Sequence, residues 1–237
     1  LTADDLSNQL ARPVQFLGNP FMDPVLPPTA LLSNTQPRIG LLPGSRRPEL
    51  EANLQLLLRL SDQLPDNNGI SLELALVSSL DDTGLERCAN GVGWQLRDGL
   101  LQRQGSPAVR VRRGAFQTVL QQSDLVISMA GTAAEQAVGL AKPVLQLPGQ
   151  GPQFTASFAE AQRRLLGPTV FCAPGDSGSQ DNLFASAELA LKLLKRIHHD
   201  LDFQQQCHTE AQRRLGSSGG GLRMASAIGG LCPSTAP

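Results

Sequence analysis

The chain lacks several features by which sequences are commonly classified. Its 237 residues contain no tyrosine and one tryptophan, so it offers no series of aromatic side chains for stacking nucleic-acid bases. Twenty Lys and Arg residues balance 21 Asp and Glu residues, and this net charge of −1 argues against general nucleic-acid binding. Residues 1–10 show no signal peptide, and no apolar run approaches the roughly 18 residues of a spanning helix. We therefore expect a cytoplasmic protein that binds no nucleic acid and contacts at most the inner membrane surface.

Metal and cofactor motifs are missing as well. The four cysteines lie far apart, with no CxxC pair and no histidine at metal-ligand spacing. Such cysteines are typical of reduced cytosolic thiols rather than of zinc sites or disulfides. The GxGxxG and GxxxxGK[ST] signatures of nucleotide-binding loops are also absent. The sequence thus predicts neither a metal nor a cofactor.

What the chain does contain is an alternation of short apolar segments with amphipathic ones. The apolar segments predict six strands, which lie within residues 38–44, 70–77, 108–113, 124–128, 142–148 and 168–173. Helical patterns follow most of them, such as the leucines at positions 50, 54, 57 and 58. This alternation indicates βαβ units and a mostly parallel sheet covered by helices on both faces. We predict one doubly wound, Rossmann-like α/β domain over residues 38–215.

The two ends of the chain differ from this pattern. Residues 1–37 are rich in Pro, Asn and Asp, which predicts an irregular entry segment or interdomain linker. Residues 216–221, GSSGGG, have the composition of a flexible linker. A short helix and a loose tail are expected after it, to residue 237.

Three loops follow predicted strands, and ligands bind at the carboxyl ends of such strands. In the first loop, Gly44 lets backbone N–H groups approach an anion, Ser45 can donate a hydrogen bond, and Arg46 supplies several donors. The alternative, equally favoured by these residues, is an ordinary turn in which Ser45 caps the next helix and Pro48 lies in its first turn.

The second loop, residues 128–136, also leads from a strand to a helix. Gly131 allows close approach of a ligand, Thr132 can donate, and Glu135 or Gln136 can bind ribose hydroxyls. The alternative is a capping box, with Thr132 as the cap and Glu135 three residues later.

The third loop, residues 148–155, contains two glycines and the amides of Gln150 and Gln153, which suit sugar or phosphate recognition as well as a plain loop. All three loops are expected at one edge of the sheet, with Gly44, Gly131 and Gly149 opening onto it. Together they indicate a ligand that contains a diphosphate.

These residues resemble a known family. The segment LLPGSRRPE (41–49) resembles the motif that opens the second domain of bacterial lipid-A-disaccharide synthase, and residues 123–149 resemble its nucleotide-binding stretch. Residues 16–23, FLGNPFMD, resemble the segment that enters this second domain. Residues 123–149 are more distantly similar to the peptidoglycan UDP-GlcNAc transferase and to UDP-GlcNAc 2-epimerase. The segment 151–162 resembles an uncharacterised bacterial group related to the synthase more closely than it resembles the synthase itself.

The resemblance implies the C-terminal, donor-binding half of a GT-B glycosyltransferase, with an N-terminal domain of similar size that holds the acceptor and the catalytic base. Residues 44–46, Gly131 and Thr132 would then lie at the donor diphosphate. The backbone of Gly114, Ala115 and Phe116 would meet the base. Gln136 occupies the place of the family's ribose-binding Glu, and Glu135 precedes it.

We therefore expect a hexosyltransferase that uses a UDP-sugar, UDP-GlcNAc or a derivative, with an unknown acceptor such as a lipid-linked one. Two alternatives are a non-catalytic module that binds a nucleotide sugar and an isomerase similar to the epimerases. No residue of this chain is assigned as the catalytic base, and the leaving diphosphate is expected to need no metal.

Overall fold

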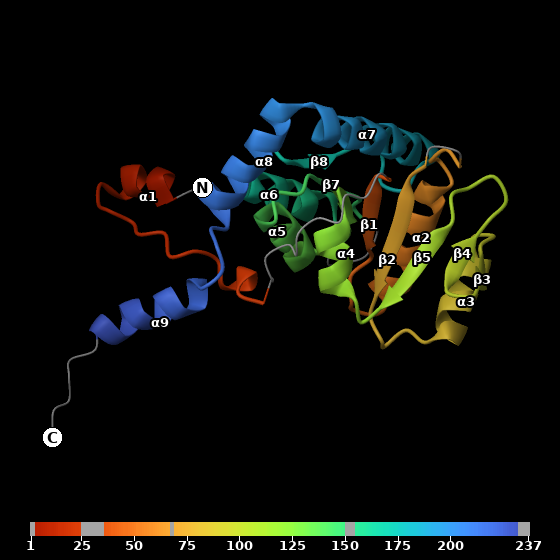
Figure 1. Ribbon diagram of the computed structural model, residues 1–237, viewed down its shortest axis with the longest axis horizontal. Coiled ribbons are helices and arrows are strands. Elements are labelled where there is room, and N and C mark those ends of the chain that lie inside the picture. The colour runs from red at the N-terminus through yellow and green to blue at the C-terminus, as the bar shows by residue number, and fades with distance from the viewer. Residues whose placement is uncertain (1–2, 25–35, 67–68, 150–154, 232–237) are drawn as a thin grey trace, which may run out of the picture.

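The computed structural model describes residues 3–24, 36–66, 69–149 and 155–231. Within these residues, eight strands form one sheet in the order β3-β4-β5-β2-β1-β6-β7-β8 (Figure 1). The strands are β1 (Arg38–Leu42), β2 (Ser71–Leu76), β3 (Gln95–Arg97), β4 (Leu100–Gln102), β5 (Val109–Arg113), β6 (Leu125–Ser128), β7 (Val144–Gln146) and β8 (Val170–Cys172). The six strands from β5 to β8 in this order are parallel, which confirms the predicted doubly wound α/β fold.

Both faces of the central strands are buried. In β1, Ile39 and Leu41 belong to the larger hydrophobic core, whereas Leu42 belongs to a smaller core on the opposite face. In β6, Val126 likewise belongs to the smaller core and its two apolar neighbours to the larger one. A strand that is covered on both faces needs apolar side chains at consecutive positions. This requirement explains why the central strands appear in the sequence as continuous apolar runs.

Helices cover both faces of the sheet (Figure 1). The larger core includes side chains of α2, α3, α7 and α8, and the smaller core includes those of α4 and α5. No helix in the described part of the chain is long and apolar enough to cross a membrane. The bounds are α2 (Glu49–Ser61), α3 (Asp82–Asn90), α4 (Phe116–Gln122), α5 (Gly131–Gly139), α6 (Ala156–Leu166), α7 (Gln180–His199) and α8 (Leu201–Arg214).

The remaining two strands form a hairpin that the sequence analysis did not predict. Strand β3 pairs antiparallel with β4, and β4 pairs antiparallel with β5. The turn between them consists of Asp98 and Gly99, whose φ angles are both positive, 50° and 73°. Asp-Gly is a preferred pair for two-residue hairpin turns of this kind. The turn signal was present, but three-residue strands are too short to show an alternating pattern.

The segment before the sheet contains more regular structure than predicted. Helix α1 (Ala3–Leu10) has no buried residue, but the 3-10 helix η1 (Pro20–Met22) packs on the domain. We call residues 16–23 the entry strap. Its Met22 is buried against α5, where a side chain at Gly139 would collide with the Met22 sulfur. The entry strap is therefore packed, although residues 1–37 were expected to be irregular.

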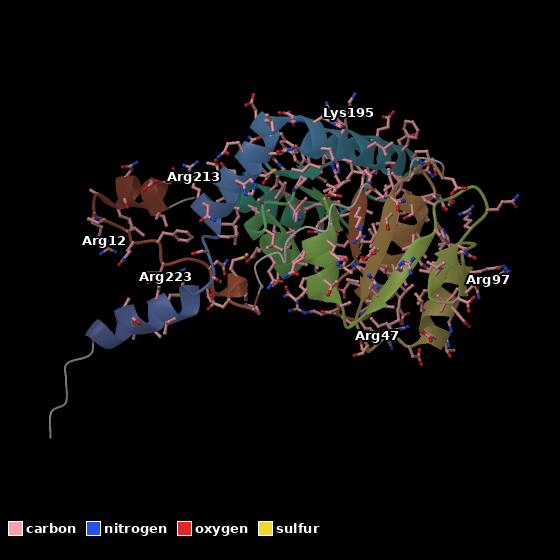
Figure 2. The ribbon with its side chains drawn as sticks, viewed as in Figure 1. Arg12, Arg47, Arg97, Lys195, Arg213 and Arg223 are labelled. Carbon is pink, nitrogen blue, oxygen red and sulfur yellow. The ribbon has the colours of Figure 1, made fainter. Side chains whose placement is uncertain are left out.

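The entry strap also holds the last described helix, α9 (Gly220–Leu231), which extends away from the sheet (Figure 1). The Asp23 carboxylate accepts hydrogen bonds from the backbone N–H groups of residues 219–221, at 2.7, 2.9 and 2.9 Å. These bonds, above all the one from residue 221, lower the pKa of Asp23. Arg223, labelled in Figure 2, donates from Nε to the Leu17 carbonyl at 2.7 Å. Two segments about 200 residues apart in sequence thus form one junction.

Candidate functional site

A cavity of about 740 Å³ lies at the carboxyl ends of the parallel strands. It is bounded by the loops after β1, β5 and β6, by the end of β2 and by part of α6. A cavity of this size suits a small-molecule ligand. Nine of the ten donor-binding residues predicted from the sequence line it: Gly44, Ser45, Arg46, Gly114, Phe116, Gly131, Thr132, Glu135 and Gln136. The tenth, Gln153, lies outside the described residues.

The three loop glycines follow neighbouring parallel strands. Gly44 comes after β1, Gly131 after β6 and Gly149 after β7, and β6 pairs in parallel with both other strands. Parallel strands end at the same edge of a sheet. The expected common edge for these three glycines is therefore confirmed.

The first loop leads into α2 without a side-chain cap. Gly44 has a φ of 95°, which side chains rarely tolerate, and the next two side chains, of Ser45 and Arg46, are exposed. Helix α2 begins at Glu49, and the residue before it, Pro48, has no side chain that can cap the helix. The interpretation that Ser45 caps this helix is therefore wrong, because the helix begins four residues later.

The second loop leads into α5, which also lacks a side-chain cap. The helix begins at Gly131, and the capping position is occupied by Ala130 in an extended conformation. Thr132 is already the second helical residue, so the alternative interpretation, a capping box of Thr132 and Glu135, is wrong. The first N–H groups of α5 therefore face the cavity without a side chain of the capping residue to bond them.

A third helix start at the cavity has the same property. Gly114, with a φ of 61°, turns the chain after β5, and Ala115 precedes α4 without a side-chain cap. Phe116, the first residue of α4, is half-buried and lines the cavity. Three helix starts without a side-chain cap thus lie around one cavity. At α2 the N–H of Leu50 donates to the Arg46 carbonyl at 2.9 Å, and the other first-turn N–H groups are the donors for a ligand.

Four other helix starts in the described part of the chain are capped, including that of α6, whose Phe158 lines the cavity. Asp81 accepts from the N–H of Gly84 at the start of α3, and Ser179 accepts from that of Asn182 at the start of α7. Helices α6 and α8 are capped in the same way by Thr155 and Asp200. Missing caps are therefore not a general property of this chain.

Glu135 and Gln136 line the cavity, but both also contact the entry strap. The Glu135 carboxylate accepts a hydrogen bond from Nδ2 of Asn19 at 3.4 Å, and burial raises the Glu135 pKa. Nε2 of Gln136 donates to the Phe21 carbonyl at 2.7 Å. These side chains therefore connect the cavity with the entry strap, a relation that sequence spacing cannot reveal.

Three further polar residues line the cavity and were not predicted. Glu49 is 8% exposed, and its Oε2 has no hydrogen-bond partner among the described residues. Asn53, one helical turn later, donates from Nδ2 to the Pro43 carbonyl at 2.9 Å and so holds the first loop. Gln162 reaches the cavity from α6. The available signal was the position of Glu49 and Asn53, four residues apart beside the leucines of α2.

Metal-binding groups do not gather in the part of the chain that the structure describes. There, no group of three or more His, Cys, Asp or Glu side chains lies close enough to hold an ion. The charged side chains that line the cavity are Arg46, Glu49 and Glu135.

Comparison with known proteins identifies the fold. No protein-family model matches the chain, and no curated protein matches its sequence. A solved structure assigned as a UDP-N-acetylglucosamine 2-epimerase from Listeria monocytogenes matches 96% of this chain and 57% of its own, with a TM-score of 0.58 and 16% identity. The spinosyn rhamnosyltransferase SpnG with spinosyn aglycone matches 91% of this chain and 51% of its own, with a TM-score of 0.56 and 15% identity.

The same rhamnosyltransferase has been solved with thymidine diphosphate, and that structure matches 82% of this chain with a TM-score of 0.52 and 16% identity. These similarities show the Rossmann-like fold that GT-B glycosyltransferases and UDP-GlcNAc 2-epimerases share. The chain spans about half the length of the solved structures that it matches.

Proposed function

We propose that the cavity binds the diphosphate of a UDP-sugar and that the chain is the donor-binding half of a glycosyltransferase. The observation that carries this proposal is the set of three helix starts around the cavity that lack side-chain caps. The first turn of a helix presents unpaired N–H groups and the positive end of the helix dipole. A phosphate group satisfies both at once.

The same arrangement suits the chemistry of sugar transfer. When the sugar leaves, the bond between its anomeric carbon and the diphosphate breaks, and negative charge increases on the diphosphate. The N–H groups of α2 and α5 and the Arg46 guanidinium would stabilise that charge. We assign no residue of this chain as the general base.

The motif resemblance narrows the donor to UDP-GlcNAc or a derivative. Gly114 and Phe116 would then meet the uracil base, and Glu135 or Gln136 would contact the ribose. The acceptor, lipid-linked in the synthase that the motifs resemble, would bind elsewhere.

A second α/β half would supply the acceptor site and the catalytic base. The matched structures are about twice as long as this chain. Large apolar side chains are exposed on α1, the entry strap and α9, which lie away from the sheet (Figure 1): Leu10, Phe16, Phe21, Leu222 and Ile228. These side chains would pack against that second half.

An isomerase similar to the epimerases is the second candidate, supported by the match to the Listeria protein over 96% of the chain. The two reactions differ in their nucleotide product. A transferase releases UDP when an acceptor is present, whereas the net product of an epimerase is a UDP-sugar in which only the configuration of the sugar has changed. Chromatography of the nucleotides after incubation of the natural full-length protein with UDP-GlcNAc distinguishes them.

The binding proposal is tested by calorimetric titration of this chain with UDP and UDP-GlcNAc. Arg46→Ala should weaken binding by about 1.5–3 kcal/mol, the range for a lost hydrogen bond to a charged group. Arg97→Ala is the control, because Arg97 is exposed in the β3–β4 hairpin far from the cavity (Figure 2). Equal affinities of wild type and Arg46→Ala, or no binding of UDP by the wild type, would refute the proposal.

A further inference from the structure

Two buried amides that are hydrogen-bonded to each other lie at the back of the cavity. Gln146, the last residue of β7, is fully buried, and Gln162 of α6 is 5% exposed. Nε2 of Gln146 donates a hydrogen bond to Oε1 of Gln162 at 2.8 Å. Burying an amide is costly unless its hydrogen bonds are satisfied. A pair of amides at this depth therefore needs a reason beyond packing.

The hydrogen bond between them sets the direction of the Gln162 amide. Its oxygen faces Gln146 and the sheet, so its NH₂ group is left to point the other way. Gln162 lines the cavity, and the bond from Gln146 is its one hydrogen bond to a side chain among the described residues. The NH₂ group of Gln162 is consequently a donor for the cavity.

This donor lies next to the start of α5. A Cβ atom at Gly131 would be 3.1 Å from Nε2 of Gln162, closer than about nine in ten real contacts of that kind. The absence of a side chain at Gly131 thus makes room for the amide beside the helix start. Helix α5 has no side-chain cap there. Backbone and side-chain donors therefore lie together, and a group that only accepts hydrogen bonds, such as a phosphate, satisfies both.

We propose that Gln162 binds a phosphate group of the ligand and that Gln146 is a positioning residue that keeps the Gln162 amide in its donating orientation. This inference rests on the proposed binding of a nucleoside diphosphate, and it adds two residues to that site. Gln162 contacts the ligand, whereas Gln146 acts through Gln162.

The direct test is Gln162→Glu, with UDP as the probe in calorimetry of the 237-residue chain. The new carboxylate still accepts the hydrogen bond from Gln146, but it presents an oxygen to the phosphate in place of the NH₂ group. UDP affinity should fall at least about tenfold, the effect of a lost hydrogen bond to a charged group. Gln206→Glu, on the exposed surface of α8, adds the same charge outside the cavity and should change the affinity less than about twofold.

The role of Gln146 is tested by a double-mutant cycle with leucine, which also keeps the test informative if Gln162→Glu fails to fold. Gln146→Leu should lower UDP affinity several-fold in the wild type and should have no further effect in Gln162→Leu, because one residue acts through the other. A merely structural role would lower the affinity in both backgrounds. The inference would be overturned if Gln162→Glu bound UDP with wild-type affinity, or if the effects of the two leucine substitutions on UDP affinity were additive. Either outcome would leave the proposed function standing. Failure of the wild type to bind UDP would overturn both.

Discussion

The helices of this protein begin in two different ways. Helices α3, α6, α7 and α8 begin with a residue whose side chain accepts a hydrogen bond from the first turn, whereas α2, α4 and α5 begin after Pro48, Ala115 and Ala130, which have no such side chain. All three helices of the second group contribute their first residue to the cavity lining, whereas α6 is the one member of the first group with a first-turn residue there, Phe158. A side-chain cap and a bound anion use the same N–H groups. The three helix starts without a side-chain cap thus all lie at the cavity, which the capped start of α6 also borders.

The largest expected effect on stability comes from the glycine in the first cavity loop. Gly44→Ala should cost about 1–2 kcal/mol in the free energy of unfolding, because alanine is strained at a φ of 95°. It should also weaken UDP binding. Gly99→Ala is the matched control, since Gly99 has a φ of 73° with open space around it in the distant hairpin. Denaturant unfolding should give similar losses for both variants, and calorimetry should give weaker UDP binding for Gly44→Ala alone. Equal UDP affinities of Gly44→Ala and the wild type would show that the first loop does not bind the ligand.

Removing a cap away from the cavity should affect stability alone. Ser179→Ala removes the hydroxyl that accepts from the N–H of Asn182 at 3.2 Å. The free energy of unfolding should fall by about 1 kcal/mol, with a melting temperature lower by about 2–4 °C. UDP affinity should stay at the wild-type value. A loss of UDP affinity would show that the two kinds of helix start are not functionally separate.

Thr132→Ala should lower UDP affinity and leave stability nearly unchanged, the reverse of the result expected for Ser179→Ala. Thr132 is an exposed residue inside α5 and not its cap, so its replacement should change the free energy of unfolding by less than about 0.5 kcal/mol. UDP affinity should fall about threefold to tenfold if the hydroxyl donates to a phosphate. Thermal unfolding and calorimetry of one sample measure both quantities. A stability loss of about 1 kcal/mol with unchanged affinity would restore the capping-box interpretation.

Helix α9 begins in a third way. The N–H groups at its start donate to the carboxylate of Asp23, which lies about 200 residues earlier in the chain. The folded-state pKa of Asp23 is lowered by the bonds from residues 219–221, so its stabilising effect is complete above the ordinary value of 3.8. That effect is lost as the pH falls through the lower folded-state pKa. Hydrogen exchange should show α9 opening in this acid range before the sheet does, and Asp23→Asn should open it already at pH 7. Because α9 packs away from the sheet, the main melting transition should change little. Equal protection of α9 in Asp23→Asn and wild type at pH 7 would contradict this assignment.

The sequence predicts the sheet and the position of the loops well, because both depend on local patterns. Apolar runs such as residues 125–127 are long enough to identify buried strands, and the order of strands and helices then places Gly44 and Gly131 at one edge. The β3–β4 hairpin was not predicted because its strands, three residues each, are too short to show a pattern. The Asp98-Gly99 pair was the one local signal for it.

The details of the site depend on contacts that local patterns do not contain. The spacing of Thr132 and Glu135 fits a capping box, but the helix begins two residues earlier than that motif requires. Gln136 donates to Phe21, 115 residues away in sequence. Gln146 could have been noticed as an amide within an apolar strand, but its partner on α6 depends on how the helix packs.

The central claim is that the open start of α5 binds the diphosphate, and Ala130→Asp tests it most directly. Ala130 already has the extended conformation of a capping residue, with φ −139° and ψ 134°, so an aspartate there can bond the N–H groups of the first turn. The account predicts that the free energy of unfolding is preserved or raised while UDP affinity falls at least about tenfold, since the carboxylate occupies the donors and repels phosphate. Preserved stability together with unchanged UDP affinity would contradict it.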